Sequence, residues 1–179
     1  MNPETEQQLK YPIGKFSPKS SYSADDFEQD LLALLALPVH LEKSIEGLDQ
    51  SQLDTPYRPG GWTVRQVVHH LADSHMNAYI RTKWTLTEDK PVIKAYNEKD
   101  WANTLENDIN PQLSIALIRA LHTKWVMLIR KIPFGELSQS FIHPDTNREI
   151  SLERMVQIYA WHSRHHVAHI TALRSRSGW

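Results

Sequence analysis

Four long stretches of the chain repeat apolar residues at the spacing of an α-helix, and this periodicity constrains the fold more than any other feature. The predicted helices cover about 23–48, 63–87, 111–131 and 151–176. Strand patterns are scarce, and no internal repeat is visible. Four amphipathic helices with little strand are typical of an all-α four-helix bundle. Because 179 residues correspond to one domain, we expect a single bundle domain over 1–179.

Residues that are typical of helix N-termini predict where these four helices begin. Ser23, Thr63 and Ser151 are suited to the N-cap of the first, second and fourth helices, because a side-chain oxygen there can accept a bond from a free backbone N–H. Asn110 followed by Pro111 predicts the start of the third helix, with proline at the first helical position.

The other segments lack a helical period. Residues 1–22 contain three prolines and one glycine, which predicts an extended N-terminal arm. Residues 88–109 are polar and predict a long connection with little regular structure. A small hairpin is expected over 140–150. Pro38 is expected to kink or split the first helix, because proline removes one backbone hydrogen bond and clashes with the preceding turn.

Composition excludes several classes of protein. The chain has 20 Lys and Arg against 21 Asp and Glu, so it lacks the basic surface typical of proteins that bind nucleic acid or anionic membranes. It has no cysteine, which excludes disulfides, thiolate metal ligands and a cysteine nucleophile. No stretch reaches the roughly 18 apolar residues of a membrane span, and the start of the chain holds no apolar signal segment. We therefore expect a cytoplasmic protein.

The chain contains ten histidines, and four of them lie close together on the fourth predicted helix. His162 and His166 fall inside its apolar face, about 40° apart, whereas His165 and His169 fall on its edge. Histidines four residues apart on a helix can bind one metal ion. Packing alone would require a buried polar partner for each imidazole, so a metal site is the favoured interpretation.

A catalytic metal site needs a third protein ligand, which should come from a helix that faces the fourth. The second predicted helix offers His69, His70 and His75. Its periodicity places His75 in the apolar stripe, His70 beside it and His69 largely away, and does not choose among them. Asp73, one turn beyond His69 and His70, is either an acceptor that orients an imidazole or a solvated acid.

The motifs around these histidines resemble those of the DinB superfamily. The stretch 60–73 (GGWTVRQVVHHLAD) is similar to its second-helix signature, and 161–170 is similar to its fourth-helix H-x-x-x-H motif. Three further stretches, 11–14 (YPIG), 53–58 (LDTPYR) and 143–145 (HPD), resemble the YfiT-like branch. The resemblance therefore spans nearly the whole chain.

This resemblance implies a four-helix bundle, a homodimer and one divalent metal ion per chain, with Zn²⁺ or Ni²⁺ expected. Carried over by position, the ligands are His70, which directly precedes Leu-Ala-Asp, and the pair His162 and His166. His169 occupies a place where many members carry glutamine, and it is expected to orient a ligand at most.

The YfiT-like branch implies a metal-dependent hydrolase acting on a small molecule. Three neutral histidines would leave an open position for a water molecule whose pKa the ion lowers toward 7. Asp73 and Tyr159 are candidates for a general base, although the sequence identifies no catalytic residue beyond the ligands.

Two alternatives remain open. In the first, the metal site belongs to an S-transferase that joins a low-molecular-weight thiol, such as bacillithiol, to an electrophile. Arg65, Arg81 and Arg164 are then candidates for holding the anionic thiol, although each is also typical of a solvated helix charge. In the second, the chain is a non-catalytic metal-binding stress protein, which would need a fourth ligand such as His75 or His169.

Overall fold

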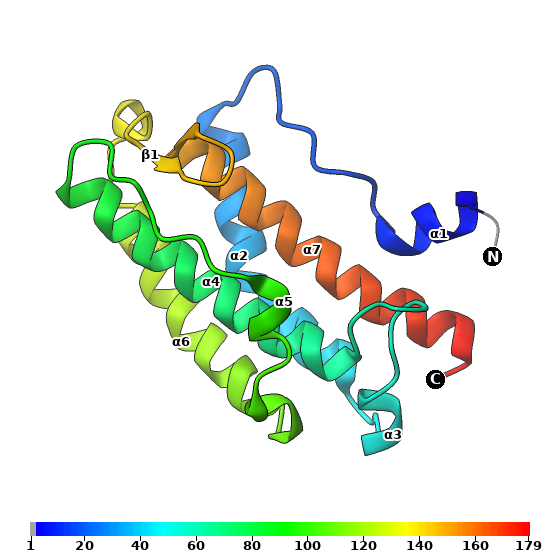
Figure 1. Cartoon of the computed structure of the whole chain (residues 1–179). Helices are drawn as coiled ribbons and strands as arrows, with labels where there is room; N and C mark the ends of the chain where they lie inside the picture. Colours follow the sequence, from blue (N-terminus) through cyan, green and yellow to red (C-terminus); the bar gives the residue numbers. More distant parts are fainter. Residues whose placement is uncertain (1–2) are drawn as a thin grey trace.

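The computed structural model describes the backbone of residues 3–179 and the side chains of 6–105 and 108–179. Four long helices form the bundle shown in Figure 1. They are α2 (Ala24–Ile45), α4 (Val64–Thr87), α6 (Gln112–Ile129) and α7 (Leu152–Ser177). Helix α2 packs against α6 and α7, and α4 packs against the same two helices. The predicted all-α four-helix bundle is confirmed.

Shorter elements connect the long helices. The helical ones are α1 (Pro3–Lys10), α3 (Gln50–Leu53), α5 (Glu98–Trp101) and the 3₁₀ turns η1 (Leu105–Asp108) and η2 (Phe134–Glu136). Strands β1 (Ser140–His143) and β2 (Arg148–Ser151) pair antiparallel, with Ser140 opposite Ser151. This pairing confirms the predicted hairpin.

The predicted caps begin three of the long helices. The side chains of Ser23, Thr63 and Ser151 each accept a hydrogen bond from the backbone N–H three residues later, at 3.1 Å in each case. Helix α6 starts one residue later than predicted, with Pro111 at its N-cap. The Asn110 side chain still accepts a bond from the Gln112 N–H at 3.0 Å.

The structure corrects three expectations about the irregular segments. The N-terminal arm is not extended throughout, because Pro3 stands at the first position of α1, where proline favours a helix. Pro38 does not split α2, which runs unbroken from Ala24 to Ile45 with Pro38 among its buried residues. Short helices α5 and η1 interrupt the predicted connection over 88–109.

The remainder of the arm lies along α7 (Figure 1). The Tyr11 ring lies 5.9 Å from the His165 ring, and Phe16 lies at the same distance from Trp161. Further along, the Lys19 N–H donates to the Gln157 side chain. The arm therefore covers the face of α7 that carries Trp161 and His165.

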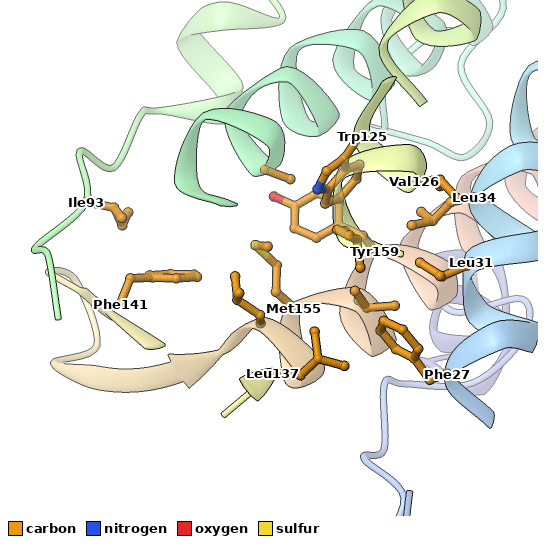
Figure 2. Packing of buried hydrophobic residues seen from close by; sticks show 14 residues of the cluster. Phe27, Leu31, Leu34, Ile93, Trp125, Val126, Leu137, Phe141, Met155 and Tyr159 are labelled. Carbon is orange, nitrogen blue, oxygen red and sulfur yellow. The ribbon is translucent and has the colours of Figure 1, made fainter. Parts of the chain in front are cut away.

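Apolar side chains form two clusters inside the bundle. Trp125 of α6 is fully buried in the first cluster, and its Nε1–H donates to Thr82 Oγ1 at 2.8 Å. Figure 2 shows Trp125 beside Tyr159 of α7, with ring centroids 5.7 Å apart. The second cluster packs Leu41 and Val68 at the other end. Among the described residues, no helix has the length and apolar character needed to cross a membrane.

Candidate metal centre

Helices α4 and α7 bring three histidines together. His70 comes from α4, and His162 and His166 come from successive turns of α7. One ring nitrogen from each lies within 4.8 Å of the other two, and Nε2 of His70 is 3.3 Å from Nε2 of His162. These are the three residues that the family resemblance selected. Their convergence follows from the i, i+4 spacing on α7 and from the packing of α4 against it.

A chain of imidazoles determines which nitrogen of His162 faces the cluster. The Leu34 carbonyl can only accept, so Nδ1 of His122 donates to it at 2.5 Å. Nε2 of His122 then accepts from Nδ1 of His75 at 2.8 Å. Nε2 of His75 in turn accepts from Nδ1 of His162 at 3.1 Å. The Nε2 lone pair of His162 is therefore left free to face His70.

A shorter chain has the same effect on His166. The carbonyl of Lys10, the last residue of α1, accepts from Nε2 of His169 at 3.1 Å. Nδ1 of His169 is then an acceptor, and Nδ1 of His166 donates to it at 3.4 Å. Nε2 of His166 is left with its lone pair. Outer hydrogen bonds of this kind set the tautomer and direction of metal-binding histidines in proteins.

The electrostatics of the cluster suit a divalent cation. Burial lowers the pKa of His70 to about 4. Burial, followed by the charges of neighbouring histidines, lowers the pKa values of His162 and His166 well below the ordinary value. The three imidazoles are therefore neutral near pH 7 and offer lone pairs rather than charge. Three neutral nitrogen ligands match the donor set of an open zinc or nickel site.

A pocket of about 690 Å³ opens onto this cluster. Trp62 lies over His70 with ring centroids 4.5 Å apart, and Tyr57 stacks on His169 at 3.9 Å. The arm and α5 also contribute to the lining, through Tyr11 and Glu98 respectively. The cluster is thus accessible to a small molecule from one side while its other sides are packed.

Two neighbouring histidines have other partners. Nδ1 of His69 pairs with Ser114 Oγ at 2.8 Å, toward α6. His165 stacks on Trp161 with ring centroids 4.4 Å apart. Both positions agree with the predicted geometry, which left His69 pointing away and His165 at the edge.

The candidate general base Tyr159 and the candidate arginines have different partners in the structure. The Tyr159 hydroxyl lies 3.5 Å from Nη1 of Arg81, outside the lining of the metal pocket. Arg65 pairs with Asp54 at 2.8 Å, and Arg164 faces Asp30 at 3.5 Å. These two arginines are therefore partnered within the chain. The proposed role of Asp73 stays a prediction.

His122 is the functional candidate that the sequence analysis missed. It lies on α6, fully buried and between the two other apolar-face positions Ile118 and Trp125. A histidine at an inward position of an otherwise apolar face is the signal that could have found it. Its connection to the cluster through His75 depends on tertiary packing and has no signature in the sequence.

Comparison with known proteins identifies the family. A sequence model of the DinB superfamily matches residues 33–170. The chain belongs to the DinB superfamily. It is 47% identical over 176 residues to YfiT of Bacillus subtilis strain 168, which covers 98% of this chain and 99% of YfiT. YfiT is named as a candidate metal-dependent hydrolase. A similarly named relative from Bacillus cereus strain AH820 is 47% identical over 96% of this chain and 98% of its own.

Solved structures of four-helix bundle proteins agree with the fold. The structure of Bacillus subtilis YfiT, described as having an unusual four-helix bundle topology, matches with a TM-score of 0.93. That match covers 96% of this chain and 99% of YfiT at 47% identity. TT2238, a four-helix bundle protein, matches with a TM-score of 0.55 at 21% identity, over 83% of this chain and 98% of its own. The second likeness shows the fold alone.

Proposed function

We propose that this DinB superfamily member is a metal-dependent hydrolase in which His70, His162 and His166 bind one divalent ion. The observation that carries the proposal is the convergence of three histidine ring nitrogens in the lining of one pocket. The names of the relatives support the same class of activity. Zn²⁺ and Ni²⁺ both suit three imidazole ligands.

The chain's own residues would prepare this site before any substrate binds. His75 and His122 hold His162 in the tautomer that presents Nε2, and His169 does the same for His166. Trp62 and Tyr57 would pack their rings against His70 and His169 and so limit the movement of these imidazoles. When bound, the ion would supply Lewis-acid chemistry that activates water and polarises a substrate carbonyl or phosphoryl oxygen.

An open fourth position is favoured over a closed structural site. Both ring nitrogens of His75 are hydrogen-bonded, to His122 and His162. Both ring nitrogens of His169 are also engaged, by Lys10 and His166. Neither of these two histidines is free to complete a four-ligand site. A vacant position beside a pocket is the arrangement expected of an enzyme rather than of a metal-carrying protein.

Elemental analysis of the untagged protein tests the metal site. We expect about one Zn²⁺ or Ni²⁺ per wild-type chain and none in a His70→Ala, His162→Ala double variant. His166→Ala should also lose the metal, whereas the matched control His165→Ala should retain it. Wild-type protein that stays metal-free after reconstitution with either ion would overturn the proposal.

Activity assays then test the reaction. The metal-loaded protein would be offered ester, amide and phosphoester substrates beside a thiol and an electrophile. Hydrolysis that disappears after chelation and returns with the metal is the expected result. Metal-dependent conjugation of the thiol without hydrolysis would replace the hydrolase with the S-transferase.

A further inference from the structure

Among the described residues, Arg81 of α4 is a buried arginine without a carboxylate partner, three turns beyond His70 on the same helix. Arg81 is 8% exposed, and its Nη1 makes a long hydrogen bond of 3.5 Å to the Tyr159 hydroxyl. Its Nε is buried without a hydrogen-bond partner. Among the described residues, the ion pairs include Arg65 and Arg164 but not Arg81. The guanidinium thus has one buried donor, its Nε–H, that no described residue satisfies.

An uncompensated buried cation is unfavourable for folding. Removing a guanidinium from water costs free energy unless a counter-charge and hydrogen-bond acceptors replace the solvent. The charge of Arg81 acts on its surroundings, because together with burial it lowers the pKa of His143 in the hairpin. His143 also has a buried Nδ1 without a partner. An anion bound here would satisfy both residues.

Arg81 lines a pocket of about 800 Å³ in which such an anion fits. Ser74 and Tyr159 come from the helices α4 and α7, Tyr96 comes from the connection before α5, and His143 comes from β1. Hydroxyl and imidazole groups therefore line the same pocket as the guanidinium. Binding pockets for small molecules place a few convergent polar groups in this way.

The charges at this pocket favour a carboxylate over a phosphate. Arg81 and Lys99 are matched by Glu98 and Asp145 among the lining residues. Two acidic side chains would repel a dianion, whereas a single negative charge requires one guanidinium only. The planar donor fork of arginine also matches a planar carboxylate with two parallel hydrogen bonds.

The arginine pocket adjoins the metal pocket. Glu98 and Lys99 of α5 line both. The ring of Tyr159 lies 5.7 Å from that of His162, while its hydroxyl faces Arg81. We propose that Arg81 and His143 bind the carboxylate of a small organic acid, which is the end of the substrate remote from the metal centre. The assignment of this carboxylate to the substrate rests on the proposed function, whereas the binding of a carboxylate by Arg81 does not.

Nitrogen-15 NMR of the full chain, before and after chelation of metal, tests carboxylate binding directly. The probes are hexanoate, its uncharged amide and inorganic phosphate. Hexanoate is expected to shift the Arg81 Nε–H and His143 ring signals in both states of the protein, with the amide inactive and phosphate weaker. Unmoved Arg81 signals, equal binding of the amide or tighter binding of phosphate would each overturn the proposal.

Variants locate the binding at Arg81. Arg81→Gln should weaken hexanoate binding at least about tenfold, and Arg81→Lys should weaken it less. Arg119→Gln is the matched control, because Arg119 is exposed and pairs with Glu42 on another face. Should Arg81→Gln fail to fold, the comparison of hexanoate with its amide on the wild-type protein decides. Wild-type protein that holds its full metal content but binds no hexanoate would overturn this pocket and leave the metal centre standing.

Discussion

At the scale of single residues, hydrogen-bond partners that do not themselves touch the candidate metal determine which ring nitrogens face it. The chain that starts at the Leu34 carbonyl passes through His122 and His75 before it reaches His162. Each imidazole in it is a donor at one nitrogen and an acceptor at the other. If one histidine of this chain is removed, the tautomers of the histidines between it and the metal centre are therefore no longer fixed.

Replacing His122 with leucine tests this dependence. His122→Leu leaves Nδ1–H of His75 without an acceptor, so His162 loses the arrangement that presents Nε2. We expect the affinity for Zn²⁺ to fall by about 10–100-fold, measured by competition with a chelator. His69→Ala, which removes a histidine bonded to Ser114 instead, is the control and should keep wild-type affinity. Unchanged affinity in His122→Leu would show that the chain does not position His162.

At the scale of elements, α4 carries both sites on one rigid helix. His70 lies near its start and Arg81 lies three turns later. The helix begins at Thr63, whose side chain accepts from the Gln66 N–H while the Gln66 side chain accepts from the Thr63 N–H. The same Gln66 donates to the Ala102 carbonyl just after α5. This cap therefore joins the start of α4 to the segment that covers both pockets.

Removal of the cap should weaken the bundle and leave the histidine geometry intact. Thr63→Ala exposes an unpaired N–H at the start of α4 and should lower the free energy of unfolding by about 1 kcal/mol, as measured by urea denaturation. Metal content per folded chain should not change. Thr87→Ala, at the exposed far end of α4, serves as the comparison and is expected to cost less. If fully folded Thr63→Ala protein bound less metal than the wild type, the metal centre would depend on the cap, which would contradict this prediction.

At the scale of the whole molecule, buried neutral histidines link stability to pH. Burial lowers the pKa of His122 to about 4, whereas an unfolded histidine titrates near 6.5. Between these values the unfolded chain binds protons that the folded chain excludes, so stability is complete above about pH 6.5 and falls toward pH 4. His70, in which burial also lowers the pKa to about 4, adds to the effect.

Metal-free protein should therefore lose stability on mild acidification. For His122 alone the linked loss is about 3 kcal/mol between pH 6.5 and pH 4. Urea denaturation at a series of pH values measures it, and His122→Leu should show a shallower decline. A free energy of unfolding that stays constant over this window would mean that the folded chain takes up as many protons as the unfolded chain does.

The outer face of α6 is where we place the homodimer that the family resemblance implies. Leu113, Leu117 and Met127 are exposed there, and Ala120 and Lys124 continue the same stripe at alternating steps of three and four residues. Such a stripe is typical of a helix that packs against a partner helix. The second copy is a proposal from resemblance and from this spacing.

Light scattering after size exclusion tests the dimer. The wild-type chain is expected at twice its 20.8 kDa mass, and Leu117→Glu should shift it to the monomer. Val39→Glu, an exposed apolar position on α2, is the control and should leave the mass unchanged. A wild-type chain that is monomeric at all concentrations would contradict the proposed homodimer.

The sequence alone determined the four helices, three of their caps, the hairpin and the inward pair His162 and His166, because each depends on spacing or on neighbouring residues along the chain. Its motifs also selected His70 through resemblance, where periodicity could not choose. Tertiary structure decided the rest. Whether Pro38 breaks α2 depends on the packing around it, and the partners of His75, His122 and Arg81 come from other helices or from the hairpin. Contacts between distant segments leave no periodic signal, and these contacts set the tautomers of the metal centre and leave Arg81 without an ion-pair partner among the described residues.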